Sequence, residues 1–390
     1  MGSDLNKEVG MDSSGPRSRY VMIGGFLGAG KTTAVGRFAQ HLVGQGLRVG
    51  LITNDQGSGL VDTASLRSRG FSTEEIPGGC FCCRFNSLVE AAKRLTEATR
   101  PDVFVAEPVG SCTDLVATVT YPLRRIYGDR FQIAPLSVLV DPIRAQRIFG
   151  LAKGARFSDK VSYIYRKQLE EANVIVINKV DLLTSGELGK LKATLEEAFC
   201  QAQVLCLSAR TGTGLEDWFE ILSEENQPHL PTVAINYDTY AEGEALLGWL
   251  NATIELKSNE AFDGNLILGE LADHLQRRMG REDAEIAHLK MTLAPERGLG
   301  DLAVINVVRN DIVPELGQGL DAPLRAGQLI LNLRAEGDPN RLEEAVREVL
   351  SELSEANDGS LSVRVEDLER FRPGRPEPTH RDGLETAGSD

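Results

Sequence analysis

The sequence predicts an α/β fold in which a mostly parallel sheet, with helices on both faces, is followed by a smaller α+β domain. Over residues 20–222, short apolar runs alternate with helix-like segments, and this alternation is typical of parallel sheets. The chemically distinctive motifs each follow one of these runs, where ligands bind on such sheets. A polar stretch with two prolines, 224–231, then breaks the pattern and indicates a linker to a second domain.

Each predicted element has a simple sequence signal. In the first domain, the strands are short apolar runs at 20–23, 49–53, 103–106, 135–140, 174–177 and 204–207. The second domain is expected to contain an apolar helix around 245–250, strands near 301–308 and 328–333, and a helix beginning at Asp338 and Pro339. Apolar residues at helical spacing in that last helix predict core packing: Leu342, Val346, Leu350 and Leu353.

Composition sets the domain organisation and excludes some partners. We expect disordered tails at 1–18 and 371–390, a first domain at 19–223, the linker, and a second domain at 232–370. The net charge of −15 argues against nucleic acid or an anionic membrane as the main partner, because phosphate binding needs a basic face. The N-terminus carries no apolar signal-peptide core, and no apolar run is long enough to span a bilayer, so a soluble, cytoplasmic protein is expected.

The strongest motif is a phosphate-binding loop directly after the first apolar run. Residues 25–32 read GFLGAGKT and fit the pattern G-x-x-x-x-G-K-[ST] between a strand and a helix. Such a loop turns backbone N–H groups toward phosphate oxygens at a helix N-terminus. The predicted nucleotide ligands are Gly25, Gly28, Ala29, Gly30, Lys31, Thr32 and Thr33. Lys31 is expected to reach the β- and γ-phosphates, and the Thr32 hydroxyl to coordinate Mg²⁺.

Two later motifs predict guanine as the base. Asn178, Lys179 and Asp181 form an N-K-x-D pattern after the fifth apolar run. The Asp181 carboxylate can accept two hydrogen bonds from guanine, Asn178 can bond the base or brace the loop, and the Lys179 stem can lie along the ring. Ser208 and Ala209 follow the next strand, where a backbone N–H could meet guanine O6. The chain is therefore expected to bind GTP and GDP rather than adenine nucleotides.

A further acidic motif, EPVG, follows the strand at 103–106. Glu107 could hold Mg²⁺ directly or through water, and the Gly110 N–H could contact the γ-phosphate and sense hydrolysis. No convincing arginine finger is present, and Gln56 is only a guess for positioning water. Intrinsic GTP hydrolysis is therefore predicted to be slow, with the activating residue left open.

Three cysteines crowd into the segment GGCFCC, between the phosphate-binding loop and Glu107. Thiolates such as Cys80, Cys82 and Cys83 are ligands suited to Zn²⁺, Co²⁺ or Cu(I), and flanking glycines allow a tight turn. The fourth ligand stays open among Asp55, Asp62, Cys112 and water. The alternatives to an exchangeable metal are a structural metal, a redox switch and a buried turn with one reactive thiol.

Together these motifs closely resemble the CobW-like family of GTP-dependent metallochaperones, related to the GTPases of urease and hydrogenase maturation. The resemblance covers about residues 20–222 and implies GTP hydrolysis coupled to delivery of Zn²⁺ or Co²⁺ to a client metalloprotein or cofactor-bearing enzyme. By motif match it carries over to Lys31, Thr32, Glu107, Asn178, Asp181 and the three clustered cysteines.

Two alternative functions remain from the sequence. One is a GTPase switch or chaperone for a corrinoid-dependent enzyme, with a structural or redox cysteine cluster. The other is a zinc-storage or sensing module whose fold the nucleotide stabilises. The metal, the client, the oligomeric state and the role of the second domain are left open.

Overall fold

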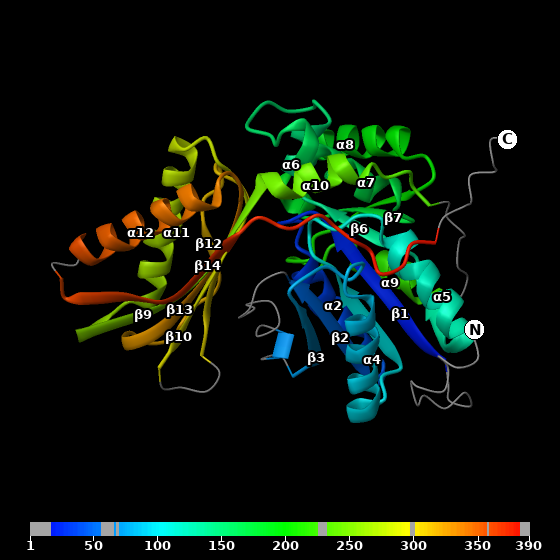
Figure 1. The fold of residues 1–390 in the computed structure, drawn as a ribbon, viewed down its shortest axis with the longest axis horizontal. Coiled ribbons are helices and arrows are strands. Elements are labelled where there is room, and N and C mark those ends of the chain that lie inside the picture. Colours follow the sequence, from blue (N-terminus) through cyan, green and yellow to red (C-terminus); the bar gives the residue numbers. More distant parts are fainter. Residues whose placement is uncertain are drawn as a thin grey trace. The chain divides into compact units, whose positions relative to one another are not determined.

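The computed structural model describes residues 17–55, 66–67, 70–224, 232–296, 301–356 and 359–382. Its chain divides into two compact units, and Figure 1 shows the elements of each. Of the described residues, the first unit comprises those up to Tyr240 together with 376–382. The second comprises those of Ala241–Arg375. No helix among the described residues is both long and apolar enough to cross a membrane.

The first unit is built on an eight-stranded sheet in which every described pairing is parallel, as the sequence predicts. The spatial order is β3-β2-β4-β1-β6-β7-β8, and β5 pairs with β1 beside β6. The strands are β1 (Ser18–Gly25), β2 (Val49–Asp55), β3 (Ser72–Pro77), β4 (Val103–Glu107), β5 (Phe131–Ile133), β6 (Ser137–Val140), β7 (Val174–Ile177) and β8 (Gln203–Cys206). Strands β3 and β5 are additions to the predicted set.

Helices cover both faces of this sheet (Figure 1). They are α2 (Lys31–Gly44), α4 (Phe85–Thr99), the π-helical turn η1 (Val116–Thr120), α5 (Tyr121–Tyr127), α6 (Pro142–Ile148), α7 (Asp159–Glu170), α8 (Ser185–Ala198) and α9 (Leu215–Ser223), with short 3₁₀ turns at Gly128–Arg130 and Val180–Leu182. The boundary between the two units falls within α10 (Tyr237–Leu246). Alternation along β1 explains the two layers: Val21 and Ile23 belong to the core with α2 and α9, whereas Tyr20 lies with α4 and α5.

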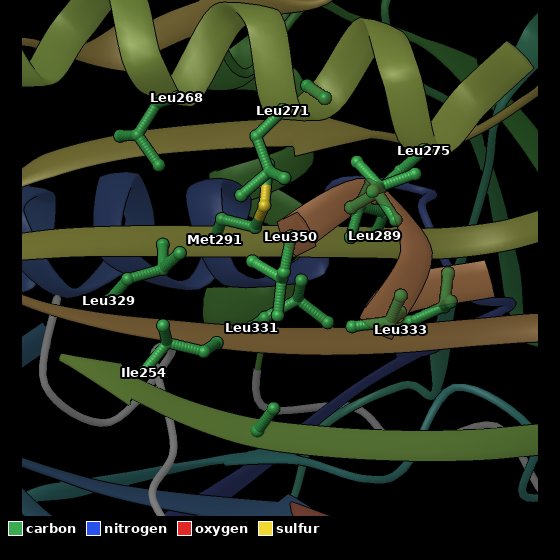
Figure 2. Packing of buried hydrophobic residues seen from close by; sticks show 14 of the residues in the cluster. Ile254, Leu268, Leu271, Leu275, Leu289, Met291, Leu329, Leu331, Leu333 and Leu350 are labelled. Atoms are coloured by element: carbon green, nitrogen blue, oxygen red, sulfur yellow. The ribbon is translucent and has the colours of Figure 1, made fainter. Parts of the chain in front are cut away.

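The second unit is a six-stranded antiparallel sheet with two helices packed on it, which confirms the predicted α+β class. The strand order is β12-β11-β10-β13-β9-β14. The elements are β9 (Leu247–Phe262), α11 (Gly264–Arg281), β10 (Glu285–Pro295), β11 (Ala303–Val307), β12 (Glu315–Gln318), β13 (Leu324–Glu336), α12 (Pro339–Ala356) and β14 (Leu361–Phe371). Figure 2 shows Leu268, Leu271 and Leu275 of α11 pointing onto the strand residues below them.

Two sequence predictions about this half of the chain are wrong. Residues 247–250 begin the long strand β9 rather than extending a helix, and the inward side chains Leu250, Ala252, Ile254 and Leu256 alternate as a strand requires. The predicted tail from 371 is also ordered as far as Asp382, because residues 376–382 hydrogen-bond to the first unit. The predicted linker lies almost entirely outside the described residues.

Candidate functional site

The predicted phosphate-binding loop connects β1 to α2, as the motif requires. Gly25 has φ of 132°, and a Cβ there would lie 2.3 Å from the Leu139 carbonyl oxygen on β6, so only glycine fits. Helix α2 begins at Lys31, so the N–H groups of its first turn face the loop. Lys31 itself is 8% exposed, which restricts its ammonium group to the neighbourhood of the loop.

The second motif meets the loop at a short distance. Thr32 Oγ1 donates a hydrogen bond of 3.0 Å to Glu107 Oε1, and Glu107 is buried at the end of β4. Adjacent oxygen ligands of one octahedral Mg²⁺ are separated by about 2.9 Å, since the metal–oxygen distance is about 2.0–2.1 Å. The separation and the chemistry of these two oxygens therefore fit a shared Mg²⁺.

Gly110, three residues after Glu107, packs directly against the phosphate-binding loop. A Cβ at this position would lie 2.8 Å from the backbone nitrogen of Leu27 and 3.0 Å from its Cα. The Gly110 carbonyl accepts a hydrogen bond of 2.9 Å from Gln168 Nε2, and the same amide donates to the Cys112 carbonyl at 2.8 Å. The segment 107–112 is thus held between the phosphate-binding loop and α7.

Asn178 braces three loops. Its Nδ2 donates to the Ala29 carbonyl at 2.8 Å, while its Oδ1 accepts from the N–H groups of Lys179 and Ala209. Asn178 is buried, and a Cβ on Gly30 would lie 2.5 Å from its Nδ2. Of the two roles that the sequence allowed, the structure shows bracing. The Ala209 N–H is used in the same brace.

Lys179 is oriented along the loop by a residue that the sequence reasoning missed. Its Nζ donates to the Gly28 carbonyl at 2.6 Å and pairs with Asp141 Oδ2 at 2.9 Å. Asp141 is buried at the end of β6 and also caps α6, since its Oδ1 accepts from Arg144 N–H. An aspartate directly after an apolar strand was the available signal.

Asp181 and Ser208 lie at the neighbouring strand ends. The Asp181 carboxylate accepts a hydrogen bond of 3.3 Å from Arg210 Nη2, so guanine binding would have to compete with this exposed pair. Ser208 is fully buried, and its hydroxyl accepts from the Thr211 N–H at 3.2 Å, which shapes the loop after β8. The predicted base-binding residues therefore lie in the loops that follow two adjacent strands, β7 and β8.

The three clustered cysteines converge. Their Sγ atoms all lie within 4.8 Å of one another: Cys80 to Cys82 is 2.6 Å, Cys80 to Cys83 is 3.2 Å and Cys82 to Cys83 is 3.7 Å. Asn54, at the end of β2, donates from Nδ2 to the carbonyls of Ile76 and Gly79 and so holds the loop. The donor set suits a thiophilic metal such as Zn²⁺ or Co²⁺.

The thiols differ in their tendency to ionise. Hydrogen bonds from Cys112, Cys82 and Cys83 hold the pKa of Cys80 well below its usual value. The hydrogen bond between Cys83 and Cys80 raises the pKa of Cys83 to about 11. The hydrogen bond with Cys80, together with burial, raises the pKa of Cys82. One thiolate is thus favoured before a metal arrives, and a bound cation would have to displace the protons of the others.

Cys112 approaches the cluster from the segment after Glu107. It is buried, and its interaction with Cys80 is the largest cause of the lowered pKa of Cys80, although its Sγ is not among the three that lie within 4.8 Å of one another. The other predicted fourth ligands lie outside the described side chains, as does Gln56: the side chain of Asp55 is not described, and neither is Asp62. Cys112 is therefore the candidate whose described side chain interacts with the cluster.

The sequence reasoning also missed two buried carboxylates: Asp114 within segment 107–118, and Glu171, which hydrogen-bonds to that segment. Glu171 accepts hydrogen bonds from Thr113 Oγ1 and the Val116 N–H, both at 3.1 Å, and burial raises its pKa to about 8. Asp114 is almost completely buried with φ of 67°, and burial raises its pKa despite bonds from Arg381 and Tyr237. Their contacts are long-range in sequence, so no local pattern marks them.

Comparison with known proteins matches the first unit to one family. Residues 19–206 match the model described as CobW/HypB/UreG, nucleotide-binding domain, which confirms the resemblance inferred from the motifs. The chain is 29% identical over 170 residues to the zinc chaperone YeiR of Escherichia coli, covering 43% of this chain and 48% of that protein. It is also 29% identical over 196 residues to the zinc chaperone CobW of a Sinorhizobium species, covering 43% of this chain and 52% of that protein. The chain thus spans about half the length of these curated relatives.

Solved structures resemble the chain more distantly. The hydrogenase maturation factor HypB from Archaeoglobus fulgidus shares 22% identity with a TM-score of 0.38, covering 56% of this chain and 92% of that one. The Zn(II)-bound YjiA GTPase from E. coli shares 13% identity with a TM-score of 0.34, covering 86% of this chain and 99% of that one.

Proposed function

We propose that this chain, whose residues 19–206 match the CobW/HypB/UreG nucleotide-binding domain, hydrolyses GTP and couples its nucleotide state to the binding and delivery of Zn²⁺ or Co²⁺. The cargo would pass to a client metalloprotein or a cofactor-bearing enzyme. Relatives named zinc chaperones support a metal cargo, and the three converging thiols support its position. The proposal includes Cys112 as the fourth ligand.

One observation carries the coupling. The segment 107–112 contacts the phosphate-binding loop at one end and the cysteine cluster at the other. Glu107 accepts a hydrogen bond from Thr32 and Gly110 packs on Leu27, whereas the Cys112 thiol interacts with that of Cys80 and lowers its pKa. A change that the γ-phosphate imposes on this segment would therefore act on Cys112, the proposed fourth ligand.

The residues of the chain divide the work of hydrolysis. Lys31 and the N–H groups at the start of α2 would bind the phosphates, while Asn178 keeps the base-binding loops against the phosphate-binding loop. The Asp181 carboxylate would select guanine by accepting from its N1–H and N2 amine. Mg²⁺, held by Thr32 and Glu107, would neutralise charge on the β- and γ-phosphates. The Gly110 N–H would contact the γ-phosphate and release it on hydrolysis.

Metal titration in defined nucleotide states tests the proposal. The protein, reduced and loaded with Mg²⁺ plus either GDP or a non-hydrolysable GTP analogue, is titrated with Zn²⁺ and Co²⁺ against a competing chelator. We expect the affinities to differ by about 5- to 150-fold between the two states, as in other coupled systems. The difference should vanish in a Cys80→Ser/Cys82→Ser variant and persist in Cys200→Ser, which alters an exposed cysteine in the turn after α8. Equal affinities in both states would refute the coupling.

A further inference from the structure

Residues 376–382, which we call the C-terminal strap, lie along the cysteine loop within the first unit. The Thr379 N–H donates to the Cys82 carbonyl at 2.8 Å, and the Thr379 hydroxyl donates to the Cys83 carbonyl at 3.1 Å. The Glu377 N–H donates to Cys83 Sγ at 3.3 Å. The His380 ring meets Phe85 edge-on, with 5.0 Å between ring centroids. The strap therefore contacts the backbone of two clustered cysteines and the sulfur of one.

The other end of the strap holds the segment that follows Glu107. The Arg381 guanidinium pairs with the Asp114 carboxylate at 2.7 Å. The Asp382 N–H donates to the Ala117 carbonyl at 2.9 Å, and its carboxylate pairs with Arg125 of α5 at 3.0 Å. Figure 1 shows this red C-terminal segment passing beside α5. One short segment thus joins two loops that the sequence separates by about 30 residues.

The contact between Arg381 and Asp114 involves a buried carboxylate. The Asp114 side chain is 1% exposed, and it accepts a second hydrogen bond of 2.6 Å from Tyr237 Oη. A buried carboxylate is costly unless charged or hydrogen-bonding groups compensate it, so Asp114 and Arg381 hold each other in place. A displacement of Asp114 would therefore displace the strap as well.

We propose that the C-terminal strap transmits the nucleotide state of segment 107–118 to the metal site, acting as a positioning element for Cys83. This inference rests on the proposed function and adds to it the part of the chain that carries the signal. A shift of Asp114 would move Arg381, and the strap would then move its Glu377 N–H relative to Cys83 Sγ. Hydrogen bonds to a ligand sulfur alter how strongly that sulfur donates to a metal, so this movement changes metal affinity.

Two matched substitution pairs in the full-length protein test the strap. Glu377→Pro removes the N–H that reaches Cys83, and the neighbouring residues are already Pro376 and Pro378; Glu377→Ala keeps the N–H and removes only the carboxylate. Arg381→Ala removes the pair with Asp114. Its control is Arg48→Ala, which removes an exposed pair with Asp102 from the opposite edge of the sheet.

Co²⁺ is the probe, because its thiolate charge-transfer band reports the sulfur ligands and its binding gives the affinity. We expect Glu377→Pro to shift this band at saturating Co²⁺ while Glu377→Ala leaves it unchanged. In Glu377→Pro and Arg381→Ala, the ratio of Co²⁺ affinities between the GTP-analogue and GDP states should fall to within about twofold of one, whereas both controls keep the ratio of the unaltered chain.

The outcomes separate the strap from the proposed function. A ratio that both strap variants retain would overturn the transmission role. An unshifted band in Glu377→Pro would overturn the contact with metal-bound Cys83. If the unaltered chain binds Co²⁺ with equal affinity in both nucleotide states, the proposed function fails and the transmission role fails with it. The comparison of the charge-transfer bands of Glu377→Pro and Glu377→Ala still decides whether the strap contacts the metal-bound sulfur.

Discussion

Replacing Gly110 with alanine should selectively weaken binding of GTP relative to GDP. The new Cβ would lie 2.8 Å from the Leu27 nitrogen and 3.0 Å from its Cα, closer than carbon tolerates, and both atoms belong to backbone that cannot rotate away. The φ of Gly110 lies outside the left-handed region, so alanine adds a clash without backbone strain. Such overpacking costs about 1–3 kcal/mol, which corresponds to about a 5- to 150-fold change in affinity.

The cost should appear mainly in the GTP-bound state, because that state needs the segment after Glu107 close to the phosphate-binding loop. Titration calorimetry with Mg²⁺ plus GDP or a non-hydrolysable GTP analogue measures both affinities. Gly24→Ala is the matched control: it lies on β1, and its added Cβ would have no neighbour closer than 3.7 Å. The reasoning is refuted if Gly110→Ala keeps the parental ratio of GTP-analogue to GDP affinity, or if Gly24→Ala loses as much.

Three further predictions follow from the site. Burial raises the pKa of the Glu171 carboxyl to about 8 from 4.5, so between these pH values the folded chain keeps a proton that the unfolded chain has lost, and the free energy of unfolding should fall as pH rises, by at most about 5 kcal/mol. Chemical denaturation from pH 5 to 8.5 should show a smaller fall for Glu171→Gln. Parallel curves for the two proteins would contradict this prediction. Asp181→Asn should lower the affinity for GTP about 100-fold, because two charge-assisted hydrogen bonds are lost, and should favour xanthosine triphosphate, whose ring carries a carbonyl where guanine has its amine. Asp217→Asn, at an exposed position, should change neither affinity. An unchanged GTP affinity in Asp181→Asn would show that Asp181 does not select guanine. Cys112→Ser should weaken Co²⁺ binding by at least about tenfold and reduce the intensity of the thiolate-to-Co²⁺ charge-transfer band. Cys200→Ser should change neither. Identical Co²⁺ spectra for Cys112→Ser and the unaltered chain would exclude Cys112 as a ligand.

The sequence predicted the part of the site that depends on local geometry. A phosphate-binding loop is specified within eight residues, since the glycines, Lys31 and Thr32 act through one strand, one turn and one helix start. The convergence of Glu107, Asn178 and Ser208 was also predictable, because the ends of parallel strands meet at one edge. The proximity of Cys80, Cys82 and Cys83 follows from their spacing in one tight loop.

The features that the sequence reasoning missed depend on tertiary contacts. Leu250 and Ile254 fit a helical stripe as well as a strand, and only pairing of β9 with β13 and β14 decides between them. The strap has the proline and charge content of a disordered tail, yet its order depends on Asp114, more than 260 residues earlier. The composition of a segment predicts whether it folds by itself, but it does not predict whether another part of the chain binds it.

The strand order explains why coupling can run through one segment. Strand β4 lies between β1, which leads into the phosphate-binding loop, and β2, whose Asn54 holds the cysteine loop. The segment that leaves β4 is therefore adjacent to both sites, and its Cys112 and Asp114 contact the cluster directly and through the strap. Linkage then makes the proposal reciprocal: if GTP raises the affinity for the metal by some factor, the metal must raise the affinity for GTP by the same factor. GTP-analogue titration with and without saturating Co²⁺ measures that second factor, and a GTP-analogue affinity that Co²⁺ leaves unchanged would contradict the coupling.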